Sequence, residues 1–128
     1  MGKRGPNKKE RSPDDIYENY YKYEVIWSAK RRGFKCLISL GQCKVLITSV
    51  CHYCGAMPSR HYDPRRFPPI APINGIDRID NSLGYVPGNV VSCCPSCNKL
   101  KGTLENNEFL QLIAKIYEYQ TQKISRTV

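Results

Sequence analysis

Apolar residues recur at helical spacing near both ends of this chain. Near the N-terminus they fall at Ile16, Tyr20, Tyr23 and Trp27, and this spacing predicts an amphipathic helix. A Ser-Pro-Asp-Asp run at 12–15 precedes the pattern and a glycine at position 33 follows it, as is typical of helix ends. We expect the aromatic face of this helix to lie mostly in the core.

The C-terminal pattern predicts another amphipathic helix, which begins near Thr103 or Asn106. Its apolar positions are Phe109, Leu112, Ile113, Ile116 and Tyr117. These positions share one face at 3.6 residues per turn, and we expect that face to pack on the rest of the protein.

Shorter apolar runs occupy the middle of the chain. Residues 34–38 could form a short strand, and Ser39 can cap a short helix that ends at Ile47. A run that carries Asp77 and Arg78 predicts a strand. A second apolar run at 90–92, beyond a turn-rich bend, predicts another. The basic segment after residue 97 can open a helix, so the fold class expected is α+β.

Proline and basic residues mark the segments that we expect to be irregular. Residues 57–73 contain five prolines, too many for a regular element, and predict a surface loop. Residues 1–13 combine Lys and Arg with Gly, Pro and Ser, which predicts a disordered basic arm. The expected organisation is this arm, a helical segment at 14–50, a core with its C-terminal helix at 51–122 and a tail at 123–128.

The formal net charge of +9 favours a polyanionic partner, most often nucleic acid. Residues 1–50 hold 11 Lys and Arg against 5 Asp and Glu, so the charge is concentrated there. The candidate nucleic-acid contacts are Arg31, Arg32, Arg60, Arg65, Arg66, Lys99 and Lys101. The alternative is a surface whose charge serves only solubility. No apolar run reaches membrane-spanning length, and the N-terminus does not read as a signal peptide, so we expect an intracellular protein.

Two Cys-x-x-Cys pairs, Cys51 with Cys54 and Cys94 with Cys97, supply four thiolates. This is the ligand set of a closed tetrahedral zinc site. Cys93 competes with Cys94, but only Cys94 keeps the two-residue spacing. A total of seven cysteines fits a disulfide framework poorly. Structural zinc contributes on the order of 10 kcal/mol, so we expect the metal to decide whether the C-terminal half folds. The remaining cysteines, Cys36 and Cys43, read as small buried hydrophobes.

The array CHYCG at 51–55 and GIDRIDNSLGYVPGNVVSCCPSCNKLKG at 75–102 resembles the HNH endonucleases, in the subgroup with four cysteines. The resemblance is clearest over 51–55 and 74–112 and covers about two-thirds of the chain. It implies a small zinc-stapled ββα-metal core with flanking N- and C-terminal helices. Many members of this family are encoded by phages, large viruses and mobile elements.

The resemblance also implies site residues. Asp77 and Asn98 match the positions that bind the catalytic divalent cation, Mg²⁺ or Mn²⁺, and Asn89 matches the asparagine that orients the site. Arg78 departs from the pattern, because most of the family has a histidine general base there. An arginine cannot accept a proton in a protein, but it can hold the scissile phosphate, and the family includes members with Asp-Arg at this place.

Another residue must therefore activate the attacking water. His61 is our first candidate, because an unperturbed pKa of about 6.5 suits general-base work. The alternative for His61 is a surface histidine without a role. His52, Tyr53 and Tyr85 are further candidates.

The resemblance thus implies a metal-dependent endonuclease that hydrolyses phosphodiester bonds in double-stranded DNA. Two other readings stay open: a degenerate HNH fold that binds DNA without cutting it, and a zinc-stabilised module that contacts RNA or protein. A homodimer is possible, because a palindromic double-strand cut needs one. We expect no membrane partner and a location in the cytoplasm of a host cell, or in the nucleus if the source is a virus of eukaryotes.

Overall fold

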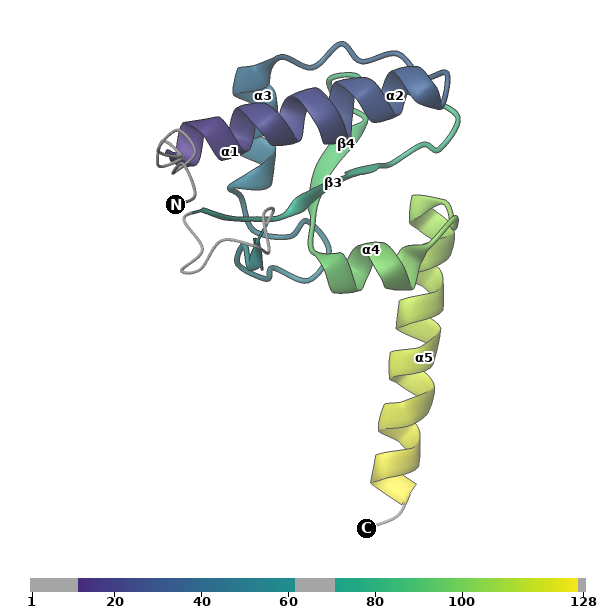
Figure 1. Cartoon of the computed structure of the whole chain (residues 1–128). Coiled ribbons are helices and arrows are strands. Elements are labelled where there is room, and N and C mark those ends of the chain that lie inside the picture. Colours follow the sequence, from purple (N-terminus) through teal and green to yellow (C-terminus); the bar gives the residue numbers. More distant parts are fainter. Residues whose placement is uncertain (1–11, 62–70, 127–128) are drawn as a thin grey trace, which may run out of the picture.

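The computed structural model describes residues 12–61 and 71–126 and shows an α+β fold (Figure 1). The predicted basic arm therefore lies almost wholly outside the described residues, as does the part of the predicted loop that holds Arg65 and Arg66. Among the helices that the structure describes, none is both long and apolar enough to cross a membrane.

The N-terminal helix is built from three segments that run end to end: α1 (Pro13–Asn19), η1 (Tyr20–Trp27) and α2 (Ser28–Arg31). Ser12 caps it, because its hydroxyl accepts from the Asp15 amide while the Asp15 carboxylate accepts from the Ser12 amide. The middle segment is a π-helix, a form often found at functional sites. The predicted helix is confirmed. Its aromatic face is only partly in the core, since Tyr20 is buried but Trp27 is 58% exposed.

Helix α3 (Leu40–Ile47) begins as the sequence predicts. Ser39 and Gln42 form a reciprocal capping box, with bonds of 2.8 and 3.1 Å between side chain and backbone. The segment before it, 34–38, is not a strand. It makes a single parallel bridge, between Cys36 and Tyr85, so the expected strand is wrong.

The bridge at Cys36 holds this segment close to the loop at 79–89. The Tyr85 amide donates to the Lys35 carbonyl and the Leu37 amide donates to the Tyr85 carbonyl, both at 2.8 Å. Gly84 sits at the point of closest approach, where a Cβ atom would collide with the backbone of Lys35. Only glycine therefore fits at this position.

The central motif is an antiparallel hairpin followed by a helix. Strand β3 (Gly75–Arg78) pairs with β4 (Val90–Cys93), with Asp77 opposite Val91. Helix α4 (Pro95–Lys101) follows β4 directly. The two predicted strands and the helix after them are confirmed. A second small sheet pairs β1 (Arg60–His61) with β2 (Pro72–Ile73).

One hydrophobic core joins the N-terminal helix to the hairpin. It contains Tyr20, Val25, Ala29, Ile38, Cys43, Ile47, Ile73 and Tyr85. Cys43 is fully buried in this core, as expected, whereas Cys36 is half-buried beside it. Because these residues come from both predicted segments of the chain, the N-terminal helix is fixed over the hairpin.

Helix α5 (Asn106–Arg126) leads away from the body of the protein (Figure 1). Phe109, in its first turn, is buried. Every residue from 110 to 120 is exposed, including Ile113 and Ile116. The prediction that the apolar face of this helix packs on the rest of the protein is therefore wrong beyond Phe109, because the helix axis carries that face out of reach.

Candidate functional site

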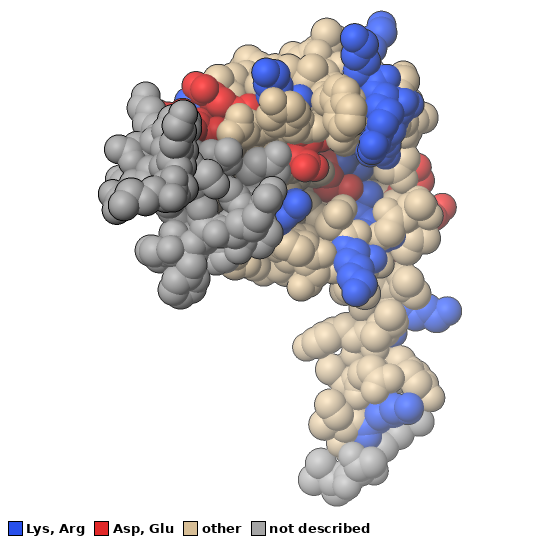
Figure 2. All heavy atoms as spheres, in the orientation of Figure 1, with Lys and Arg blue, Asp and Glu red and all other residues tan. Residues whose placement is uncertain are grey.

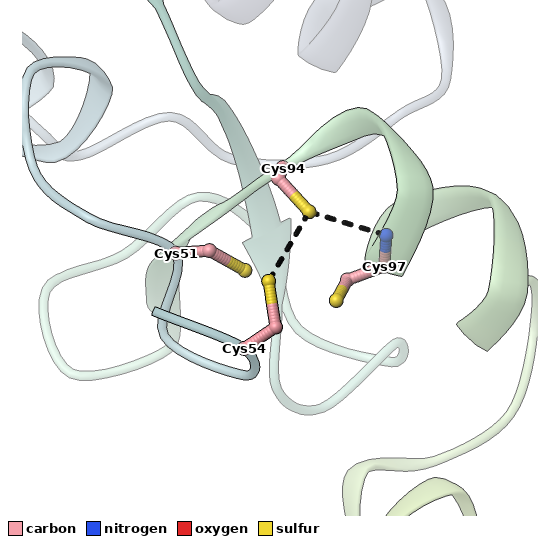
Figure 3. Close-up of side chains that lie close together, drawn as sticks. All are labelled: Cys51, Cys54, Cys94 and Cys97. Carbon is pink, nitrogen blue, oxygen red and sulfur yellow. Dashed lines mark hydrogen bonds between the residues drawn. The ribbon is translucent and has the colours of Figure 1, made fainter. Parts of the chain in front are cut away.

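Four cysteine thiols converge at the junction of two segments (Figure 3). Cys51 and Cys54 lie in the turn after α3, whereas Cys94 is the N-cap of α4 and Cys97 lies in its first turn. All four Sγ atoms are within 4.8 Å of one another, and those of Cys54 and Cys94 are 3.6 Å apart. A tetrahedral zinc site with bonds of about 2.3 Å has sulfur–sulfur edges of about 3.8 Å. The cluster could therefore hold a metal ion such as zinc.

Cys93 does not belong to this cluster. Its side chain is buried on β4, and its thiol faces the Cys94 carbonyl oxygen at 3.5 Å. The Cys-x-x-Cys spacing thus correctly predicted that Cys94, and not Cys93, belongs to the cluster.

The thiols of the cluster do not ionise alike. Burial raises the pKa of Cys51, but backbone N–H groups of Cys54, Cys94 and Tyr53 outweigh this effect and lower it to about 6. Burial, together with the thiols of Cys54 and Cys94, raises the pKa of Cys97. Four close thiolates need a cation to coexist, and a divalent metal supplies that charge.

Beside the cluster, a cleft of about 290 Å³ opens between the N-terminal helix and the hairpin. Its floor is formed by β3 and the start of α4, and one wall is formed by the N-terminal helix. It is lined by Tyr20, Glu24, Ser28, Arg32, Arg60, Gly75, Ile76, Asp77, Arg78, Asn81, Tyr85, Cys93, Pro95, Asn98 and Gly102. Figure 2 shows acidic side chains at the centre of one face with Lys and Arg side chains around them.

Asp77 lies on β3 with its carboxylate held from two sides. The Tyr53 hydroxyl donates to its Oδ2 at 2.6 Å, and the Lys101 ammonium lies 3.1 Å from the same oxygen. Burial and the adjacent Asp77 carboxylate raise the pKa of Tyr53. Tyr53 therefore keeps its proton and acts as a donor in this arrangement.

Lys101 is almost completely buried, with 1% of its surface exposed. Its ammonium also contacts the other Asp77 oxygen and the Arg78 carbonyl, each at 3.4 Å. The structure contradicts the prediction that Lys101 contacts nucleic acid, because its ammonium is buried and paired with the Asp77 carboxylate. Lys101 instead ties the end of α4 to β3, and the sequence offers no signal for this pairing.

Arg78 is also buried, and it lines the cleft. Its Nη1 donates to the carbonyls of Asn81 and Leu83 at 2.9 Å, and its guanidinium stacks 3.9 Å from the centre of the Phe34 ring. One side of this side chain therefore shapes the β3–β4 turn.

Asn89 is buried in the same loop. Its Oδ1 accepts from the Asp80 amide at 2.9 Å, and its Nδ2 donates to the carbonyls of Asp80 and Gly84 at 3.1 and 3.0 Å. These three bonds close the loop between β3 and β4 and fix the end of the strand that carries Asp77.

The other predicted residues are distributed as follows. Asn98, Arg32 and Arg60 line the cleft, and Lys99 is exposed on α4. Arg31 is exposed and its guanidinium lies 5.4 Å from the centre of the Trp27 ring. His61 belongs to β1, but its side chain is outside the described part of the chain, as are Arg65 and Arg66.

The cleft also contains residues that were not predicted, notably Glu24 and Ser28. With Tyr20 and Arg32 they recur every four residues along the N-terminal helix. This repeat of mostly polar residues is visible in the sequence. It was not recognised, because aromatic residues lie between its members and dominate the pattern.

No protein-family model matches this chain. The chain is similar to an uncharacterized protein of Acanthamoeba polyphaga mimivirus, with 29% identity over 102 residues, which are 80% of this chain. The matched part is only 17% of the viral protein's length.

Among solved structures, the chain is similar to the rare-cutting HNH restriction endonuclease PacI. The TM-score is 0.56 and the identity is 20%, over 92% of this chain and 87% of that one. The likeness shows an HNH-like α+β fold, and the four cysteines of this chain cluster as the sequence predicts. At this identity the likeness concerns the fold.

The thiol cluster gives a first testable prediction. Cys54→Ser should reduce bound zinc from one ion per chain towards none and unfold the C-terminal half, because structural zinc contributes on the order of 10 kcal/mol. Elemental analysis after dialysis and circular dichroism measure the two effects. Wild-type zinc should also be lost as the pH falls, because protons compete for the thiolates.

The matched control is Cys36→Ser, which changes a half-buried thiol outside the cluster. It should keep its zinc. A wild-type chain without zinc after dialysis, or a Cys54→Ser variant that retains it, contradicts the assignment.

A second prediction concerns the buried ion pair. Lys101→Met removes the only charge partner recorded for Asp77 among the described residues, and it should lower the free energy of unfolding by about 3 kcal/mol. Asp77→Asn combined with Lys101→Met should cost less than the sum of the two single changes, because the two charges interact. Denaturant titration of the zinc-loaded protein measures all four states. Lys99→Met, on the exposed side of α4, should change stability by less than about 0.5 kcal/mol. Additive single effects would contradict the pairing.

Proposed function

We propose that this chain is a metal-dependent DNA endonuclease of the HNH type, which hydrolyses phosphodiester bonds. The observation that carries the proposal is the meeting of Asp77 from β3 and Asn98 from α4 in one cleft beside the four-thiol cluster. The fold shared with an HNH restriction endonuclease supports it. In this proposal zinc at the thiol cluster is structural and separate from the catalytic cation.

Asp77 and Asn98 would hold Mg²⁺ or Mn²⁺. A carboxylate and an amide oxygen are hard donors that suit these ions, and a bound ion supplies stabilisation of negative charge on the phosphate. The Lys101 ammonium lies on the same carboxylate. We therefore expect weaker cation binding than an unpaired carboxylate would give, because the two positive charges repel.

The substrate phosphates would be held by basic residues around the cleft. Arg32 and Arg60 line it, and Lys99 is exposed on the adjoining helix. Arg78 presents positive charge to the cleft from a fixed position, because the β3–β4 turn holds its Nη1. Arg31, on the exposed surface, remains a proposed contact. Arg65 and Arg66, outside the described residues, remain proposed contacts as well.

Water activation has two candidates in this proposal. His61 is adjacent in sequence to Arg60, which lines the cleft. Glu24 lines the cleft directly from the N-terminal helix, and a carboxylate can also serve as a general base. Tyr53 is a poor candidate, because burial and Asp77 raise its pKa and its proton is committed to Asp77.

A second candidate function is DNA binding without cleavage. It is favoured by the contacts that Tyr53 and Lys101 make with Asp77, since these partners compete with a cation for the carboxylate. A DNA mobility shift that falls with salt but is not accompanied by nicking would support this alternative. Binding that prefers RNA to DNA would favour a zinc-stabilised RNA-binding module.

The proposed function predicts that the zinc-loaded chain nicks supercoiled plasmid with Mg²⁺ or Mn²⁺ and is inactive in EDTA. Asp77→Asn should lower the rate by about 100-fold or more, because it removes the charged ligand of the cation. Asp14→Asn, which changes an exposed carboxylate paired with Lys44, should keep the wild-type rate. Gel analysis of nicked and linear plasmid measures the outcome. Equal rates for Asp77→Asn and Asp14→Asn would refute the assignment.

The general base of the proposed mechanism predicts how the cleavage rate depends on pH. The rate should rise with pH through the pKa of the base, because only the deprotonated form accepts a proton. If His61 is the base, this limb lies near a pH of about 6.5, and His61→Ala removes it. If Glu24 is the base, the limb survives in His61→Ala and disappears in Glu24→Gln. A limb that survives in both variants would exclude both residues.

A further inference from the structure

Helix α5 carries a broad apolar face that no other described element covers. Seven large side chains on it are between 38% and 69% exposed: Leu110, Leu112, Ile113, Ile116, Tyr117, Tyr119 and Ile124. At 100° per residue these positions share one half of the helix surface. The opposite half is polar and carries Gln111, Lys115, Glu118 and Gln122.

Such a helix is poorly stable alone. It has 21 residues, so it is about 30 Å long, and only Phe109 in its first turn is buried. Helices in water gain most of their stability by packing an amphipathic face. The later turns of α5 therefore need a covering surface.

The charge of α5 argues against a polyanionic partner. Helix α5 contains Lys115, Lys123 and Arg126 against Glu108 and Glu118, a net charge of only +1 in a chain of +9. Helices that bind DNA or anionic membrane surfaces carry an excess of Lys and Arg on the polar side. On α5 acidic and basic side chains nearly balance, and its apolar face fits a protein surface.

We propose that α5 pairs with α5 of a second copy of this chain. Two copies present the same apolar face to each other, as a two-fold interface requires. The seven side chains expose on the order of 100 Å² each, close in sum to the ~800 Å² that one partner contributes to a stable interface. Two of the seven are tyrosines, a residue type enriched at interfaces.

This pairing leaves the cleft open, because no residue of α5 lines it. The proposal does not rest on nuclease activity and is tested without DNA. A chain that dimerises but never nicks DNA would support the pairing while opposing the proposed function.

The test compares two double variants of the zinc-loaded full chain by analytical ultracentrifugation at micromolar concentration. Ile113→Asp with Ile116→Asp places two charges on the apolar face, and we expect the dimer dissociation constant to rise by about 100-fold or more, because buried unpaired charges are costly. Gln111→Asp with Gln122→Asp places the same charges on the polar face. This control should remain dimeric like the wild type.

Zinc content and circular dichroism verify that each variant is folded. If the apolar-face variant loses zinc, Tyr117→Gln replaces it, because Tyr117 is 69% exposed and contributes little to the monomer core. A monomeric wild type overturns the proposal, as does a dimer that survives in folded apolar-face variants. A monomeric wild type that sediments with zwitterionic lipid vesicles would assign the face to a membrane surface instead.

Discussion

The four-thiol cluster is the constraint on which the hairpin and its helix depend. It joins two turns that are 40 residues apart, at Cys54 and Cys94. Loop closure over such a distance costs conformational entropy. The hairpin alone has only two strands of four residues each, and their contacts offset little of that cost. A metal ion bound by the four thiols would supply the stability that this small sheet cannot. The cluster also sets the start of α4, because Cys94 is both a member of the cluster and the N-cap of that helix.

A second constraint acts at the other end of α4. The cluster fixes the beginning of the helix, and the contact between Lys101 and Asp77 fixes its end against β3. A buried ion pair seldom adds much net stability, but it enforces one arrangement of its partners. Asn98 lies between these two anchor points. Its position in the cleft therefore follows from backbone geometry that the chain itself holds rigid.

The sequence predicted the fold well where a local pattern carries the information. Both hairpin strands, the capped helix at Leu40–Ile47 and the set of four cysteines follow from periodicity, capping and spacing. The predictions failed where the outcome depends on distant neighbours. Lys101 reads as a surface residue in a basic segment, and only the fold reveals that Asp77 lies beside it. The face of α5 reads as core, because periodicity shows that a face is apolar but not whether anything lies against it.

The candidate site was predictable to a smaller extent. Asp77, Arg78 and Asn98 could be named from a motif, whereas Glu24 and Ser28 belong to a helix more than 40 residues earlier in the chain. Their place in the cleft arises because Val25 and Ala29 anchor the same helix in the core. No local signal connects the two regions.

The π-helical segment at Tyr20–Trp27 gives the N-terminal helix a different number of residues per turn from that of a regular α-helix. Its wider turns set the rotation of the residues after it, such as Ser28 and Ala29, against those before it, such as Ile16. Loss of a single residue from this segment would restore an α-helical turn and rotate the helix before it against the helix after it by about 100°. One-residue insertions and deletions in this segment would therefore change the wall of the cleft, while the hairpin and the thiol cluster keep their lengths.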